Sequence, residues 1–171
     1  MTYDEIIRRR CSIRKYAEKP VEEEKLNAVL EAGRIAPAGA NKQPVRVYAL
    51  TSDEALAKVR SLTPCAFNAP VVLLVTFDSE LEWKNPFTPY ASAGQQDAAI
   101  AGTQMMLEAT NLGLDSCWVN YFNVEKVHDA FELPASERLL FMLPSGYAAE
   151  GQGPNPRHTD RNAMDIFAKR L

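Results

Sequence analysis

Hydrophobic and polar residues recur along this chain with two different periods, and each period predicts a different kind of element. Apolar residues three to four apart predict helices over residues 3–10, 21–36, 52–62, 93–113, 123–133 and 162–171. Alternating or continuous apolar residues predict strands over residues 45–51, 69–78, 114–122 and 138–147. The run at 69–78 is apolar almost throughout, which is typical of a central strand buried on both faces.

The order of these elements indicates the fold class. Strands and helices are mixed without a regular strand–helix–strand repeat, which predicts an α+β fold. The helix at 93–113 is rich in small and apolar residues on more than one side, so we expect it at the centre of the molecule or at a subunit interface. A length of 171 residues suits a single domain, residues 1–171, with a substantial hydrophobic core.

Composition and charge argue against several classes of function. The net charge of −3 and the pI of about 5.5 argue against nucleic acid as a partner. The three cysteines form no CxxC pair, so we expect a reducing, cytoplasmic location rather than a disulfide framework. Two histidines are too few for a histidine-rich metal site. The charged N-terminus does not look like a signal peptide, and no apolar run is long enough to span a bilayer, so we expect no membrane partner.

One basic stretch, IIRRRCSIRKY at residues 6–16, stands out in this acidic chain. On a helix over residues 3–10, Arg10 shares the face of the two isoleucines, which should be the buried face. If the residues that follow are extended, Ser12 and Arg14 lie on one side. Arg10, Ser12 and Arg14 could then surround one phosphate group, with planar guanidinium groups and a hydroxyl between them. The alternative is a solvated basic helix end whose arginine pairs with a nearby glutamate.

The segment APAGANKQP, residues 36–44, is a second candidate. Its small residues leave backbone amides uncovered, so a flat ligand could approach closely. Asn41 and Gln43 add amide donors and acceptors of the kind that match the edge of a heterocycle. The alternative is an ordinary helix-to-strand turn, which needs the same small residues, and the residues alone favour that alternative.

Two further groups of residues carry a weaker signal. Asn120 interrupts an apolar strand, and a buried amide needs hydrogen-bond partners. The neighbouring Trp118 and Tyr121 also fit a hydrophobic core. Arg157 and Arg161 lie in a polar stretch with several prolines and glycines, where most arginines are solvated.

No common catalytic template occurs in the chain. GxSxG, GxxxxGK[ST], HExxH and GxGxxG are all absent. Neither histidine lies in a context that would activate Cys11 or Cys117 as a nucleophile. We therefore predict no catalytic side chain, because an enzyme poor in nucleophiles and bases is expected to take its chemistry from a cofactor.

Four segments, in order along nearly the whole chain, together resemble motifs of the nitroreductase family of flavoproteins. RCSIR at residues 10–14 matches the family's R-x-S-x-R/K. APAGANKQP matches A-P-S-x-x-N-x-Q-P, and LGLDSCW at residues 112–118 matches the G-L-G/D-S-C-W that follows a long helix. SGYAAEGQGPNPRHTDR at residues 145–161 is similar to the family's late G-Y followed by a proline-rich stretch with an arginine.

The resemblance implies a nitroreductase-like fold with a central mixed or antiparallel sheet flanked by helices, in an intertwined homodimer that holds FMN in two interface sites. The residues implied for the phosphate and ribityl side are Arg10, Cys11, Ser12 and Arg14, with Arg161 as the best match for a late phosphate-side arginine and Arg157 as the second. The residues implied for the ring are Pro37, Ala38, Gly39, Asn41 and Gln43 of the partner subunit's loop, with Asn120 and Tyr121 on the opposite side.

Three departures from the family pattern affect this assignment. Many members carry Ser where this chain has Gly39, which puts one hydroxyl contact with the flavin in doubt. Asn120 and Tyr121 stand where some members carry Glu-Gly, which weakens the transfer of substrate contacts. The chain is also short for the family and leaves no room for a long insertion over the flavin, so we expect an open pocket.

The function implied by the resemblance is that of an FMN-dependent NAD(P)H oxidoreductase. In a ping-pong scheme, NADH or NADPH would reduce the flavin, and a nitroaromatic, quinone or similar small-molecule acceptor would then be reduced, without a metal. Two alternatives within the fold are a flavoenzyme with another specific reaction and an FMN-binding redox sensor or flavin carrier without NAD(P)H turnover. An anion-binding interaction domain without flavin is a third.

Overall fold

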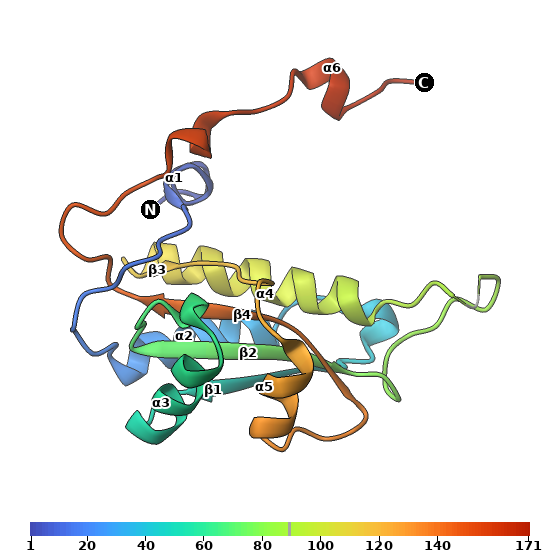
Figure 1. Cartoon of the computed structure of the whole chain (residues 1–171). Coiled ribbons are helices and arrows are strands. Elements are labelled where there is room, and N and C mark those ends of the chain that lie inside the picture. Colours follow the sequence, from blue (N-terminus) through green and yellow to red (C-terminus); the bar gives the residue numbers. More distant parts are fainter. Residues whose placement is uncertain (89) are drawn as a thin grey trace.

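An antiparallel sheet lies at the centre of the computed structural model, which describes residues 1–88 and 90–171 (Figure 1). In spatial order its four strands are β1 (Val45–Leu50), β2 (Val71–Asp78), β4 (Glu137–Gly146) and β3 (Asp115–Ser116). Each neighbouring pair within the described residues runs antiparallel. The α+β class with a central sheet is therefore confirmed, and the sheet is of the antiparallel kind.

Helices cover both faces of this sheet (Figure 1). On one face, α2 (Glu23–Arg34) packs on α4 (Gly94–Asn111), and both contribute to a core beneath them. On the other face, α3 (Asp53–Leu62) and α5 (Val124–Ala130) close a second core. The sheet thus forms the middle layer of three.

The composition of β2 explains why two cores form. Seven of its residues are buried and only the last is partly exposed, as its continuous apolar run predicts. Val72 and Leu74 pack in the core with α3 and α5, whereas Leu73 and Val75 pack with α2 and α4. This division follows because successive side chains of a strand point to opposite faces.

The first helix, α1 (Tyr3–Arg9), departs from the prediction in its packing. Thr2 and Glu5 form a capping box at its start, so the local sequence signal is confirmed. None of α1, all of which is described, is buried, and Ile7 is 40% exposed. The expectation that Ile6 and Ile7 mark a buried face is wrong for the single chain, because α1 lies outside the three layers, next to α4.

The strand predicted over residues 114–122 is much shorter than expected. Regular pairing is confined to β3, followed by one bridge between Val119 and Met142. Among the described residues, β3 pairs with β4 on one side and is bridged on the other side by Ser12 alone, and its regular pairing ends at Ser116. Asn120 is therefore exposed rather than buried, and Tyr121 is 85% exposed rather than part of the core.

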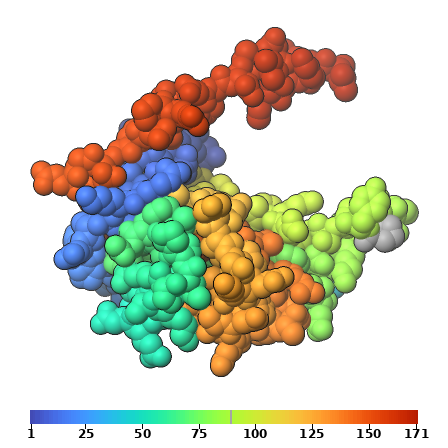
Figure 2. All heavy atoms as spheres, viewed as in Figure 1, coloured from blue at the N-terminus to red at the C-terminus, as the bar shows by residue number. Residues whose placement is uncertain are grey.

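The last residues form an arm that leaves the rest of the molecule. It contains η3 (Pro156–Thr159) and α6 (Met164–Phe167) and is exposed along nearly its whole length. Figures 1 and 2 show the arm passing α1 and extending into open space. Met164, Ile166 and Phe167 are 74%, 65% and 82% exposed. Such a run of uncovered apolar side chains is typical of a surface that contacts another protein.

Candidate functional site

The basic stretch continues beyond α1 as an extended segment at the edge of the sheet. Cys11 and Ile13 are buried, whereas Ser12 and Arg14 are turned outward. Ser12 bridges to Ser116, and the N–H of Ile13 donates to the Ser116 carbonyl at 3.1 Å. The predicted alternation is confirmed, and it brings Ser12 and Arg14 to one side.

A hollow of about 340 Å³, which we call the basic hollow, opens on that side. It is lined by Ser12, Arg14, Asn155, Arg157 and His158. None of these described lining residues is a carboxylate, so the two guanidinium groups meet no acidic partner in the hollow. Two planar guanidinium groups with a hydroxyl between them suit a phosphate group.

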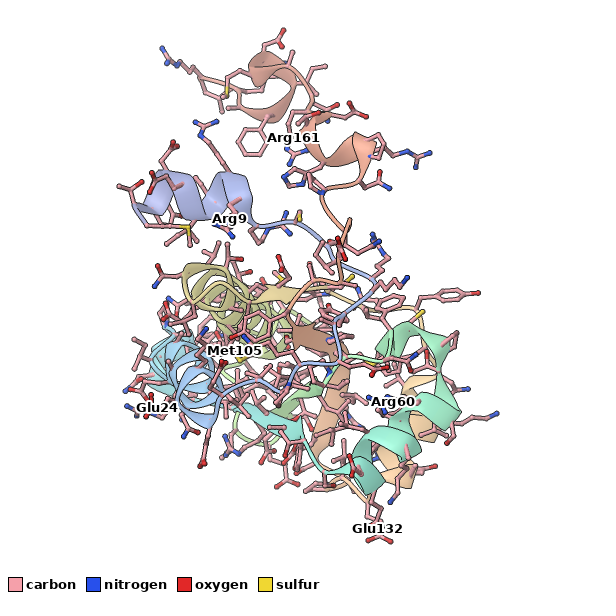
Figure 3. The ribbon with its side chains drawn as sticks, turned by 90° about the vertical axis from the view of Figure 1, so that its left-hand side faces the viewer. Arg9, Glu24, Arg60, Met105, Glu132 and Arg161 are labelled. Carbon is pink, nitrogen blue, oxygen red and sulfur yellow. The ribbon has the colours of Figure 1, made fainter. Side chains whose placement is uncertain are left out.

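Arg157 and Arg161 differ in their relation to this hollow. Arg157, the second choice from the sequence, lies in the lining with Ser12 and Arg14. Arg161, the first choice, lies further along the arm beyond α1 (Figure 3), and its Nη1 donates to the carbonyl of Asp160 at 2.6 Å. A phosphate contact by either arginine stays a prediction.

The surroundings of the three arginines in the last turn and at the end of α1 also differ. Arg8 fits the solvated alternative, because its Nε donates to the Asp4 carboxylate at 2.8 Å on the exposed face of the helix. Arg9 is exposed on the same helix (Figure 3). Arg10 ends the helix and is half-buried, so it is the one of the three held close to the extended segment.

The thiols of this region are buried and protonated. Burial, followed by the nearby Asp115 carboxylate, raises the pKa of the Cys11 thiol. Burial likewise raises the pKa of Cys117, although Arg14 works in the opposite direction. Since the thiolate is the reactive form, both cysteines are poorly suited to nucleophilic chemistry, which supports the prediction that no side chain of the chain acts as a catalytic nucleophile.

Residues 1–88 and 90–171 contain no candidate for a metal site or for a membrane-spanning helix. These residues contain no group of three or more His, Cys, Asp or Glu side chains that could hold a metal ion. None of their helices combines the length and apolar character that crossing a membrane requires.

The loop at residues 36–44 is held in an unusual backbone conformation. It contains η1 (Gly39–Asn41), and Ala40, Asn41 and Gln43 have φ angles of 48°, 53° and 51°. Left-handed φ values are uncommon for residues with a Cβ and persist only where the surroundings enforce them. The loop is therefore more constrained than an ordinary turn between a helix and a strand.

Asp97 of α4 provides one of these constraints. The N–H of Gly39 donates to Asp97 Oδ1 at 2.9 Å, and Asp97 is only 3% exposed. The other carboxylate oxygen, Oδ2, is buried without a hydrogen-bond partner among the described residues. Asp97 was not predicted from the sequence, although an acidic residue beside Ala98 and Ala101 on a buried helix was a usable signal.

Gly39 also has a packing reason to be glycine. A Cβ built on it would lie 2.8 Å from the Ala93 Cβ and 3.0 Å from the Trp83 Cβ. Real Cβ atoms almost never approach so closely, so a serine at this position would force its neighbours apart. This explains why the chain departs from the serine that many family members carry there.

The side chains of Asn41 and Gln43 are exposed and paired. Gln43 Nε2 donates to Asn41 Oδ1 at 3.1 Å, which leaves Asn41 Nδ2 as a donor and Gln43 Oε1 as an acceptor for a ligand. A hollow of about 450 Å³ is lined by Pro37, Ala38 and Gln43 together with parts of α2, β1 and α4. These groups suit the edge of a heterocycle, as the sequence predicts.

Asn120 and Tyr121 lie at a third hollow of about 310 Å³. Its lining also includes Thr63 and Pro64, where η2 (Pro64–Ala66) follows α3. The indole Nε1 of Trp118 donates to Asn120 Oδ1 at 3.0 Å. The amide thus has a partner, but on the surface rather than in the interior.

The single chain brings some of the predicted residues together and keeps others apart. Cys11 and Cys117, which are next to Ser12 and Ser116 in the chain, belong to the core shared with α3 and α5. The loop at 36–44 follows α2 and touches α4, on the opposite side of the sheet. None of the three hollows described above is lined by both this loop and Asn120.

Known proteins resemble this chain over most of its length. The Nitroreductase family model matches residues 7–65 and 60–147. A Methanothermobacter thermautotrophicus protein named "Putative NADH dehydrogenase/NAD(P)H nitroreductase" is 31% identical over 156 residues, 87% of this chain and 78% of that protein.

Solved structures agree with these sequence matches. A nitroreductase family protein from Clostridium difficile 630 superposes with a TM-score of 0.91 and 33% identity, covering 99% of this chain and 98% of that one. A "putative nitroreductase in complex with FMN" from Desulfovibrio desulfuricans superposes with a TM-score of 0.82 and 26% identity, covering 98% and 95% of the two chains.

Proposed function

Because the chain belongs to the nitroreductase family, we propose that it is an FMN-dependent oxidoreductase that takes electrons from NADH or NADPH. The electrons go to a nitroaromatic, quinone or similar small-molecule acceptor. The names of its relatives, an NAD(P)H nitroreductase and a nitroreductase in complex with FMN, support this activity. The observation that carries the proposal is the basic hollow, where two arginines and a hydroxyl meet without a carboxylate in the described lining.

The residues present fit FMN, which has a phosphate at one end and a flat ring at the other. Ser12, Arg14 and Arg157 supply the phosphate end, with Arg10 close by. From the bridge between Ser12 and Ser116, four residues lead to Asn120, a span of at most about 14 Å. The basic hollow and the hollow beside Asn120 and Tyr121 therefore follow each other along one segment, in the order that the two ends of FMN require.

We propose that the other wall of the ring site belongs to a second copy of the chain. The partner's loop at 36–44 would then face Asn120 and Tyr121, which share no hollow with the loop of their own chain. The exposed apolar side chains of the arm and of α1 support such a homodimer, since they would otherwise remain in water.

The chemistry supplied by bound FMN is acceptance of a hydride and delivery of electrons. The chain's own residues bind and orient the cofactor. The arginines of the basic hollow hold the phosphate, Asn41 and Gln43 offer a donor and an acceptor to the ring edge, and Tyr121 offers an exposed aromatic face. No thiol or histidine of the chain acts as a nucleophile or a base in this scheme.

We also propose that the protein is located in the cytoplasm. Cys11, Cys65 and Cys117 are all free in the structure, and free thiols are typical of a reducing compartment.

The test is the visible spectrum of the purified protein, followed by titration with NADH and NADPH without air. We expect a yellow protein that is bleached by at least one nicotinamide and reoxidised by a quinone or nitroaromatic faster than free reduced FMN is. A colourless protein that takes up no FMN would contradict the proposal. Bleaching by dithionite but by neither nicotinamide would point to a flavoenzyme with another donor.

A further inference from the structure

The side chains of Trp118 and Asn120 form a hydrogen bond whose direction is fixed by the chemistry of the indole. The Trp118 Nε1 lies 3.0 Å from the Asn120 side-chain oxygen. An indole N–H can only donate, so the atom of Asn120 that faces it must be the oxygen and not the nitrogen. The two ends of an amide are usually hard to tell apart, but here the donor decides the orientation. Asn120 Nδ2 is therefore turned away from Trp118.

The indole itself is held firmly. It stacks on Phe141 with 3.5 Å between ring centroids and 22° between ring planes, and Phe141 is 2% exposed. Gly102 of α4 supports it closely, since a Cβ built there would lie 2.8 Å from Trp118 Cζ3. The indole cannot turn without disturbing α4 and β4, so its N–H is a fixed reference for the amide.

The free end of the amide is available to a ligand. Asn120 is exposed and lines the hollow of about 310 Å³ with Thr63, Pro64 and Tyr121. Within the described part of the chain, no acceptor receives a hydrogen bond from Asn120 Nδ2. Two N–H donors thus stand beside an exposed tyrosine ring, at the end of the site where the flavin ring is proposed to lie.

We propose that Trp118 is a positioning residue that holds the Asn120 amide as a hydrogen-bond donor toward the flavin ring. The inference rests on the proposed function. It adds that the amide nitrogen of Asn120, and not its oxygen, faces the flavin ring. Without the indole N–H, the amide could rotate and present its oxygen instead. A donor beside the ring stabilises the electron-rich reduced flavin more than the oxidised flavin. Trp118 therefore raises the reduction potential of the flavin through Asn120.

The main test is Trp118→Phe, which keeps an aromatic ring against Phe141 but removes the N–H donor together with part of the volume of the indole. We expect the dissociation constant of FMN, measured by titrating the apoprotein, to rise about two- to tenfold. We expect the reduction potential of the bound flavin to become more negative. A tenfold change in the relative affinity for reduced and oxidised flavin corresponds to about 30 mV for a two-electron couple.

Asn120→Asp is a second, independent test that does not depend on the folding of a Trp118 variant. The aspartate keeps an acceptor for the Trp118 N–H but replaces the outward amide nitrogen by a carboxylate oxygen. We expect a larger negative shift of the potential than in Trp118→Phe, because an anion then faces the reduced ring. Phe141→Leu is the packing control: it loosens the stack but keeps the N–H donor, so its shift of the potential should be smaller than that of Trp118→Phe.

The outcomes separate this inference from the proposed function. If the wild type binds FMN but Trp118→Phe and Asn120→Asp leave both affinity and potential unchanged, only this inference is wrong. If Phe141→Leu shifts the potential as much as Trp118→Phe does, the effect comes from packing, which also overturns it. A wild type that binds no FMN contradicts the proposed function and this inference together.

Discussion

At the scale of single residues, the two late arginines give different expectations for FMN binding. Arg157 lines the basic hollow with Ser12 and Arg14, whereas Arg161 lies on the arm and donates to a backbone carbonyl. We expect Arg157→Ala to raise the dissociation constant of FMN by about ten- to a hundredfold, the cost of a lost hydrogen bond to a charged group. Arg161→Ala should have a smaller effect, and titration of the apoprotein with FMN measures both.

The control for this comparison is Arg8→Ala. Arg8 is exposed and paired with Asp4, so its removal should leave FMN affinity nearly unchanged. An equal loss in Arg8→Ala would mean that overall positive charge, and not the basic hollow, decides the binding. A greater loss in Arg161→Ala than in Arg157→Ala would restore the order that the sequence favours.

The carboxyl group of Asp115 gives a prediction for stability against pH. Burial raises its pKa above the ordinary 3.8, although the N–H of Ala148 donates to it. Folding therefore favours the protonated form, and this contribution is present below pH 3.8 and is lost as the pH rises through the raised pKa. At neutral pH, the ionised Asp115 destabilises the fold.

We therefore expect Asp115→Asn to be more stable than the wild type at pH 7, because the amide keeps the acceptor for Ala148 and carries no charge. The difference should shrink as the pH falls toward 4. Denaturant unfolding of the apoprotein across this range measures it. A variant less stable than the wild type at pH 7 would show that the charge is compensated in the folded state.

At the scale of elements, the sequence predicts those helices and strands that depend on the local pattern of apolar, polar and capping residues. β2 is identified by its apolar run, and α3 begins after Ser52, which caps it as its position predicts. The alternation at 114–122 shows that the chain is extended but not whether another strand lies beside it, so β3 is shorter than predicted. The bond between Gly39 and Asp97 joins residues 58 positions apart, and no local pattern encodes such a partner.

The loop at 36–44 depends on that distant partner. Asp97→Ala removes the acceptor of the Gly39 N–H and leaves a buried donor unpaired, which should lower the free energy of unfolding by about 1–3 kcal/mol. We also expect weaker FMN binding, because the strained residues Ala40 and Asn41 lose support.

Asp97→Asn keeps an oxygen acceptor and is the matched control, so it should retain most of the affinity. Chemical unfolding and FMN titration of both variants give the comparison, and equal losses of FMN affinity would mean that the charge matters more than the hydrogen bond.

At the scale of the whole molecule, the single chain leaves two kinds of surface incomplete. The basic hollow and the hollow beside the loop at 36–44 share no lining residue, and the arm carries apolar side chains into open space (Figure 2). In the proposed homodimer, a second copy would cover the arm and would bring its own loop to the hollow of the first copy. Sequence periodicity could not predict this arrangement, because it describes faces within an element and not which chain covers them.

The arm therefore gives a prediction that links assembly to cofactor binding. Ile166 and Phe167 are 65% and 82% exposed in the single chain, and burying each against a partner contributes about 1.5–3 kcal/mol. We expect the double variant Ile166→Ser/Phe167→Ser to weaken self-association by about a hundredfold or more, seen by light scattering during size-exclusion chromatography. FMN affinity should fall with it, because each site would lose the partner's loop. Asp165→Ala, in the same turn of α6, should leave both properties unchanged. A double variant that stays dimeric would show that the arm does not hold the two copies together, and a monomeric variant with undiminished FMN affinity would contradict a flavin site built from two chains.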